Sequence, residues 1–137
     1  MKPSLQPGVS MVKRIVVDRD RTIGFMGDDG RVYATPRLVS DVEYTCRDLI
    51  LQHTDPGEDS VGTEVMLKHQ AAALLGSTVE VSVRVVSVDG RKVVFAASVR
   101  DEIDEISSGT HSRFVVDVTR TKERLKAKAA KLAALPR

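Results

Sequence analysis

Three side chains in this sequence have types and positions that suit acyl-transfer chemistry: Thr35, Glu43 and His69. Glu43 follows Thr35 by eight residues, and His69 follows Glu43 by twenty-six. A carboxylate and an imidazole on apolar walls suit general base catalysis or a covalent acyl-carboxylate route, because burial and pairing tune how readily they exchange protons. The backbone N–H groups of Arg37 and Leu38, at the start of a predicted helix, would polarise a carbonyl oxygen.

The same residues also have structural interpretations, which the pattern alone leaves open. His69 could be a satisfied core histidine, and Glu43 could be a helix-edge residue that pairs with Arg47. Cys46 could act as a thiolate beside His69, although a lone buried cysteine is usually a small core hydrophobe.

A helix predicted over Thr35 to Ile50 positions two of the three candidates. Thr35 is expected to be its N-cap, and Pro36 suits the first helical position. At about 100° per residue, the helix has an apolar arc and a polar face. The apolar arc holds Leu38, Val39, Val42, Cys46, Leu49 and Ile50, and the polar face holds Arg37, Asp41, Tyr44, Asp48 and Gln52. Glu43 falls inside or beside the apolar arc, where a carboxylate loses hydration, so its burial indicates a role beyond packing.

The rest of the chain is predicted to be mostly strands. Val12 to Val17 form the first strand, and a long polar loop from Asp18 to Arg31 precedes the helix. The helix ends near Pro56-Gly57, and the apolar period then changes to two residues. One face of the next strand is expected to carry Val61, Thr63, Val65, Leu67, His69 and Ala71.

Three further strands are expected in the second half of the chain. They lie around Val79–Val85, Arg91–Arg100 and Ser107–Val118, and Asp89-Gly90 indicates a hairpin between the first two. His111 and Arg113 alternate along the last strand, and for His111 a structural role and a site role are both open.

This order of elements predicts an α+β fold in which a curved antiparallel sheet wraps around one central helix. A basic C-terminal helix is expected over residues 120–137, and residues 1–10 are expected to be a loose leader of a single 1–137 domain. Only 4% of the residues are aromatic, so the core must be built mainly from aliphatic side chains. Because such a sheet has open edges, edge-to-edge pairing of two copies predicts a homodimer.

Composition narrows the possible partners and cofactors. The 21 basic and 19 acidic residues are well mixed and give a net charge of +2, which does not imply a nucleic-acid partner. No apolar run approaches a membrane span, and the single Cys46 fits a reducing cytoplasm. The three histidines lack metal-ligand spacing, so no metal is predicted. An adaptor that acts through basic residues 121–137 is the weakest functional hypothesis.

Several motifs together resemble those of the hot-dog-fold acyl-CoA thioesterases, in particular the branch of the fluoroacetyl-CoA thioesterase. The shared features are a threonine at the helix start, a glutamate eight residues on, a Pro-Gly-Glu/x-Ser-x-Gly-Thr segment and a histidine twenty-six residues after the glutamate. Here they are Thr35, Glu43, Pro56-Gly57-Glu58-Asp59-Ser60-Val61-Gly62-Thr63 and His69. Val88-Asp89-Gly90-Arg91 and residues 104–113 also resemble this family, so the likeness covers about residues 33 to 118.

The resemblance implies hydrolysis of an acyl-CoA to a carboxylic acid and CoA, with no cofactor because CoA is part of the substrate. It implies a catalytic constellation of Thr35, Glu43 and His69, in which Glu43 acts either as nucleophile or as general base. Gly62, Thr63, Arg113 and Tyr33 are the implied substrate-binding residues.

One segment departs from the family pattern and affects specificity. Residues 26–33 are polar and carry Tyr33 as their only aromatic residue, whereas the fluoroacetyl enzyme has a phenylalanine-rich lid. A different, larger or more polar acyl group is therefore expected. The alternative function is a non-catalytic hot-dog module that binds an acyl thioester or a small acid.

Overall fold

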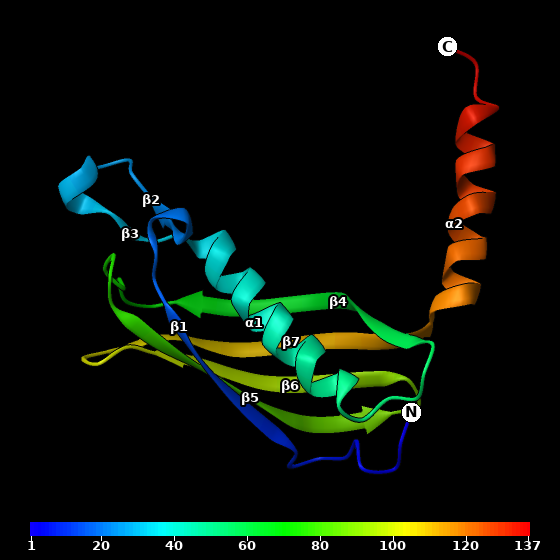
Figure 1. The fold of residues 1–137 in the computed structure, drawn as a ribbon, viewed down its shortest axis with the longest axis horizontal. Coiled ribbons are helices and arrows are strands. Elements are labelled where there is room, and N and C mark those ends of the chain that lie inside the picture. Colours follow the sequence, from blue (N-terminus) through cyan, green and yellow to red (C-terminus); the bar gives the residue numbers. More distant parts are fainter.

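The computed structural model describes all residues 1–137 and contains one five-stranded antiparallel sheet with a helix across it (Figure 1). The elements in chain order are β1 (Ser10–Val16), the 3-10 helix η1 (Arg19–Arg21), β2 (Thr22–Ile23), the 3-10 helix η2 (Asp28–Gly30), β3 (Val32–Tyr33), α1 (Thr35–Leu51), β4 (Glu58–His69), β5 (Thr78–Asp89), β6 (Lys92–Arg100), β7 (Glu105–Asp117) and α2 (Val118–Ala133). The predicted order of a strand, a loop, a helix and four strands is confirmed. The loop contains the small β2–β3 pair, and residues 18–34 are called the lid segment below.

The strand order in space is β1-β5-β6-β7-β4, and every neighbouring pair is antiparallel. β5, β6 and β7 form a meander, whereas β4 pairs with β7 and not with β5, which follows it in the sequence. The connection through α1 carries the chain from one edge of the sheet to the other, across a single face (Figure 1). Consequently β1 and β4 are the two edge strands.

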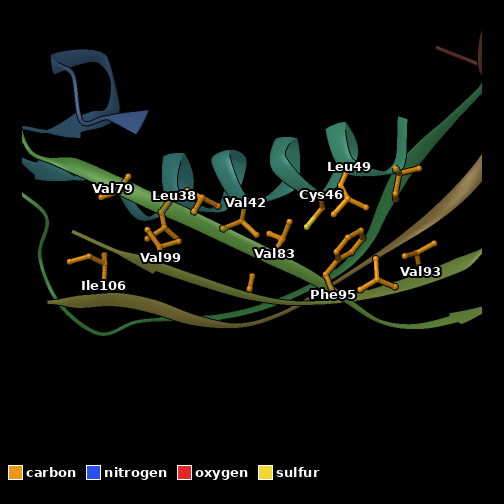
Figure 2. Close-up of a cluster of buried hydrophobic side chains, with 14 of the residues drawn as sticks. Leu38, Val42, Cys46, Leu49, Val79, Val83, Val93, Phe95, Val99 and Ile106 are labelled. Carbon is orange, nitrogen blue, oxygen red and sulfur yellow. The ribbon is translucent and has the colours of Figure 1, made fainter. Parts of the chain in front are cut away.

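The core lies between α1 and the inner face of the sheet (Figure 2). The predicted apolar arc of α1 is confirmed at its centre, since Leu38, Val42, Cys46, Leu49 and Ile50 are fully buried. The alternating valines of β5 and β6 face this arc, and Phe95 is the large aromatic side chain among them. Burial of this many aliphatic side chains, at about 25 cal/mol per Å² of apolar surface, fixes α1 on the sheet.

The start of α1 differs from the prediction. Ala34, rather than Thr35, is the N-cap, and no side chain caps the helix. Thr35 is the first helical residue and Pro36 the second, where proline is still tolerated because its missing N–H has no intrahelical partner. The Thr35 hydroxyl is therefore free to bond elsewhere.

Asp41, which was expected on the solvent-facing side of the helix, is also placed differently. Its exposed fraction is only 9% because the lid segment covers this part of α1. Tyr33 Oη donates a hydrogen bond of 2.5 Å to Asp41 Oδ2, and Arg21 Nε donates to the same oxygen over 3.0 Å. These bonds attach the lid segment to the helix.

A β-bulge interrupts the regular alternation in β4. Gly62 pairs with Arg113 and Glu64 pairs with Ser112, so Thr63 is an extra residue without a partner in β7. The expectation that Val61 and Thr63 share a face with His69 is therefore wrong, because the bulge shifts the alternation by one residue. Gly62 faces α1 instead.

The two ends of the chain lie differently against this body. In the segment expected to be a loose leader, Leu5 is buried in the core, and Gly8 N donates to Val85 O over 2.9 Å. α2 has no buried residue and stands away from the sheet (Figure 1). Its N-cap, Asp117, accepts a hydrogen bond from Arg120 N over 3.0 Å.

None of the helices is both long and apolar enough to cross a membrane.

Candidate active site

Thr35 and His69, two of the predicted catalytic residues, lie side by side. Thr35 Oγ1 is 2.7 Å from His69 Nδ1, and the hydroxyl donates or accepts according to the imidazole tautomer. Nε2 of His69 is buried without a hydrogen-bond partner. The pair borders a hollow of about 330 Å³ beneath the lid segment, lined by Ile23, Val32, Tyr33, Thr35, His69, Gln70, Ala71 and Ala72. The imidazole is thus held at one nitrogen and unengaged at the other.

Glu43 lies beside a second hollow, between α1 and the bulged part of β4. This hollow has a volume of about 600 Å³ and is lined by Ser40, Glu43, Tyr44, Arg47, Ser60, Val61, Gly62 and Arg113. A Cβ atom at Gly62 would lie 3.2 Å from Glu43 Oε1 and 3.4 Å from Arg113 Nη1. Gly62 therefore leaves the space in front of the carboxylate and the guanidinium open.

The alternative in which Glu43 pairs with Arg47 does not occur. Arg47 forms a bidentate pair with Asp59, with Nη2 and Nε at 2.7 Å and 2.9 Å from the two carboxylate oxygens. Glu43 itself makes no side-chain hydrogen bond or ion pair. Its carboxylate remains available to a substrate or a water molecule.

Arg113 is a buried cation that faces this carboxylate. Its Nε donates to Ser60 Oγ over 2.8 Å, and its Nη2 donates to Ser60 O over 2.9 Å. Burial lowers the pKa of Arg113, and the nearby Glu43 carboxylate opposes that change. Because arginine keeps its charge even so, the site presents a fixed positive charge next to Glu43.

His111 belongs to this cluster, although its sequence pattern left its role open. It is buried, and its ring carbon Cε1 would lie 3.3 Å from a Cβ at Gly62. The signal in the sequence was its position two residues before Arg113 in a strand, which puts both side chains on one face. That signal alone does not separate a core histidine from a site residue.

Two implied substrate-binding residues make local contacts. The hydroxyl of Tyr33 is engaged by Asp41, and its ring meets the His69 ring edge-on at a centroid distance of 6.5 Å. Burial, followed by the bond to Asp41, raises the pKa of Tyr33, so the phenol stays protonated. Thr63 forms the bulge, and its Oγ1 donates to Ser112 O over 3.2 Å.

Two other predicted roles are not supported by the geometry. The N–H groups of Arg37 and Leu38 both donate to the Ala34 carbonyl over 3.0 Å, so they are not free to polarise a substrate. Burial raises the pKa of the Cys46 thiol to about 12, so Cys46 is a core side chain and not a thiolate nucleophile. No group of three or more His, Cys, Asp or Glu side chains could hold a metal ion.

Within one chain, the candidate residues form two groups. Eight residues of α1 separate Thr35 from Glu43, which corresponds to about 12 Å along the helix axis. Thr35 and His69 meet at the lid end of the helix, whereas Glu43 meets Gly62, His111 and Arg113 near its middle.

Comparisons with known proteins identify the family of the chain. Residues 17–119 match the fluoroacetyl-CoA-specific thioesterase family, FlK. The fluoroacetyl-CoA thioesterase of Streptantibioticus cattleyicolor is 30% identical over 135 residues, covering 93% of this chain and 97% of that protein.

Solved structures give the same result. A variant of the fluoroacetyl-CoA-specific thioesterase in complex with fluoroacetate and CoA superposes with a TM-score of 0.79 at 31% identity, over 85% of this chain and 99% of that one. A thioesterase superfamily member from Thermus thermophilus superposes with a TM-score of 0.89 at 27% identity, over 98% and 100% of the two chains.

The fold and these relatives define an acyl-CoA thioester hydrolase with a hot-dog fold, in which one helix is wrapped by a curved antiparallel sheet. This result favours the hydrolase over the non-catalytic binding module. The chain belongs to the fluoroacetyl-CoA-specific thioesterase family.

Proposed function

We propose that this protein hydrolyses an acyl-CoA at a site formed by Thr35, Glu43 and His69, and that two copies of the chain together complete each site. The observation that carries the proposal is the 2.7 Å contact between Thr35 Oγ1 and His69 Nδ1, which leaves the buried Nε2 unengaged. An imidazole held at one nitrogen can transfer a proton at the other. No cofactor is needed, because CoA enters as part of the substrate.

The exposed edge of β4 supports a homodimer. On this strand Val61, Val65 and Met66 have exposed fractions of 45%, 42% and 67%, which is unusual for apolar side chains along a sheet edge. Pairing of two β4 strands about a two-fold axis would cover these side chains and satisfy the free backbone groups of both edges.

Such a pairing would bring the two groups of site residues together. In an antiparallel pair related by a two-fold axis, residues equally far from the axis lie opposite each other. We place the two-fold axis near Val65, in the middle of residues 61–69 of β4. His69 of one copy then lies opposite Val61 of the other copy. Glu43 and Gly62 lie at that point, so each site combines Thr35 and His69 of one chain with Glu43 of the other.

In this site Glu43 promotes attack on the thioester carbonyl. It either bonds to the carbonyl carbon to give a mixed anhydride, which water then hydrolyses, or takes a proton from the attacking water. In both routes the C–S bond breaks, the CoA sulfur takes up a proton through His69, and water supplies the second oxygen of the acid. Thr35 orients the imidazole, and Arg113 holds its positive charge beside the Glu43 carboxylate.

We also propose that the acyl-CoA substrate carries an acyl group other than fluoroacetyl, because the lid segment is mostly polar. Its hydrogen bonds and ion pairs join Asp28, Arg19, Arg31 and Thr22, and no aromatic cluster forms over the site. We also propose a cytoplasmic location for the protein, because its single cysteine is buried and unpaired.

The test is the release of free CoA thiol from a panel of acyl-CoA substrates that includes fluoroacetyl-CoA. We expect turnover of at least one substrate, and a loss of about 100-fold or more in Glu43→Ala and in His69→Ala. Glu123→Ala on α2 and His53→Ala near the N-terminal segment are matched controls that should keep wild-type rates. Full activity in both site variants would overturn the assignment of the site.

A mixing experiment tests whether the sites are shared between chains. Unfolding and refolding equal amounts of Glu43→Ala and His69→Ala chains together makes about half of the dimers mixed, each with one intact site. We expect about a quarter of the wild-type activity to return. If the mixture stays as inactive as the separate variants, the shared site is wrong, whereas turnover by the wild type would still support the thioesterase function.

A further inference from the structure

His111 is a buried histidine beside Glu43 that the proposed reaction does not use. It comes from β7, and its ring approaches Gly62 together with Glu43 of α1 and Arg113 of β7. Its exposed fraction is 1%, so both of its ring nitrogens depend on protein partners.

The hydrogen bonds of His111 determine its tautomer. Nδ1 is 2.8 Å from Glu64 O, and because a carbonyl oxygen only accepts, Nδ1 must carry the proton. Nε2 is 3.2 Å from Nη1 of Arg113, and because a guanidinium only donates, Nε2 must be the acceptor. The ring is therefore neutral in this arrangement.

The Arg113 guanidinium is held on three sides. Ser60 accepts from Nε and from Nη2, and His111 accepts from Nη1, which lies close to Gly62 on the side where the Glu43 carboxylate also approaches Gly62. Ser60 thus fixes Nε and Nη2 of the guanidinium, and His111 alone holds Nη1. Without that bond, Nη1 would be free to leave its place near Glu43.

The β4 bulge takes part in this anchor. The register shift between Gly62 and Glu64 lies where the Glu64 carbonyl accepts from His111, so the irregular strand supplies the contact that orients the ring. The same bulge turns Gly62 toward α1. One local feature therefore opens the space in front of Glu43 and fixes the histidine beside it.

We propose that His111 is a positioning residue that acts through Arg113: its neutral ring, held by the Glu64 carbonyl, fixes Nη1 of Arg113 beside the reactive carboxylate of Glu43. This inference rests on the proposed function. Two charged groups face the ring, Arg113 from β7 and Glu43 from α1. Burial lowers the pKa of His111, and the Arg113 charge lowers it further. The hydrogen bond to the Glu64 carbonyl and the Glu43 charge oppose this change without reversing it, so the accepting form is the stable one.

Two substitutions separate the two hydrogen bonds of the ring. In His111→Gln the side-chain amide reaches the position of Nε2 and its oxygen accepts from Arg113. In His111→Asn the amide lies at the position of Nδ1 and bonds Glu64 but not Arg113. We expect kcat to fall roughly 10- to 100-fold in His111→Asn with KM changed less than about 3-fold, and His111→Gln to recover most of that loss. His53→Asn is the matched control.

A double-mutant cycle shows whether His111 acts through Arg113. If it does, His111→Asn should lower kcat by less than about 2-fold in an Arg113→Lys background, because the guanidinium that it orients is already gone. An equal loss in both backgrounds would overturn the proposal, and so would equal rates for the asparagine and glutamine variants.

A measurement without turnover keeps this inference separate from the proposed function. The ¹⁵N NMR spectrum of the histidine rings in the wild-type protein should show a protonated Nδ1 and an unprotonated Nε2 for His111 at neutral pH. The opposite tautomer, or a doubly protonated ring, would overturn the proposal even if no variant folds. An absence of acyl-CoA turnover together with the expected tautomer would instead count against the proposed function alone.

Discussion

The hydroxyl of Thr35 bonds across to another element instead of back along its own helix. The type of residue and its position before Pro36 favoured an N-cap, but Ala34 holds that position and Thr35 bonds His69 on β4. The spacing of Thr35, Glu43 and His69 singled out these three groups as candidates, which stays a prediction. It could not show that Thr35 and His69 meet while Glu43 lies two helical turns away, because that distance depends on how β4 folds back along α1.

A pair of substitutions at Thr35 distinguishes these two roles. Thr35→Val removes the hydroxyl with little change in shape and should lower kcat about 100-fold, whereas Thr35→Ser should stay within several-fold of the wild type. Because no cap is lost, the free energy of unfolding should change by less than about 0.5 kcal/mol in Thr35→Val. Steady-state kinetics and urea titrations measure both quantities. A loss of about 1 kcal/mol or more in Thr35→Val, with unchanged kcat, would restore the capping role.

At the scale of elements, local patterns predicted what each segment is but not which strand it joins. The helix, the long strands and the hairpin at Asp89-Gly90 followed from periodicity and turn residues, which are local properties. The pairing of β4 with β7 and the bulge at Thr63 depend on contacts between distant segments. The bulge therefore invalidated the expected face of Val61, although residues 61–69 were correctly predicted as a strand; the strand ends at His69, before the predicted Ala71.

The lid segment is attached to α1 by a small buried network that can be tested. Tyr33→Phe removes the hydrogen bond to Asp41, whose carboxylate keeps only Arg21 as a partner. We expect the free energy of unfolding to fall by about 1 to 2 kcal/mol. Because Thr35 follows Tyr33 by two residues, kcat/KM should also fall several-fold.

The second tyrosine of the chain provides the control for stability. Tyr44 lies on α1 with an exposed fraction of 58% and makes no side-chain hydrogen bond, so Tyr44→Phe should match the wild type in urea titrations. If Tyr33→Phe is as stable as Tyr44→Phe, the lid segment is not held by this network.

The whole molecule has a closed core and two open sheet edges, β1 and β4. The sequence predicted a dimer from the general difficulty of open sheet edges. Both edge strands carry exposed apolar side chains, Val12 and Val16 on β1 and Val61, Val65 and Met66 on β4, and we propose pairing through β4 because His69 lies on it. The prediction could not name that edge, because the spatial strand order was unknown. In the proposed dimer, the positions of His69 and Gly62 along β4, with Glu43 of α1 beside Gly62, connect the oligomeric state to the chemistry.

A charge placed on this edge should separate the copies. Met66 is exposed and lies next to the proposed two-fold axis, so Met66→Lys puts two like charges close together and leaves the core unchanged. Light scattering after size exclusion should then give the mass of one chain, 15.0 kDa, instead of twice that value. Activity should fall with the loss of the dimer. Leu125→Lys, the same change on exposed α2, is the control, and a Met66→Lys dimer with full activity would contradict the proposed interface.

The way the lid segment is held has a consequence for how this protein could acquire new substrates. Its base is fixed by Tyr33 and Arg21, but Phe25 and Met26 at its tip have exposed fractions of 89% and 69%. Substitutions at such exposed positions usually change stability by less than about 0.5 kcal/mol. The tip can therefore change in sequence while the helix, the imidazole and the carboxylate keep their places, and we propose that substitutions there are a route to new specificities.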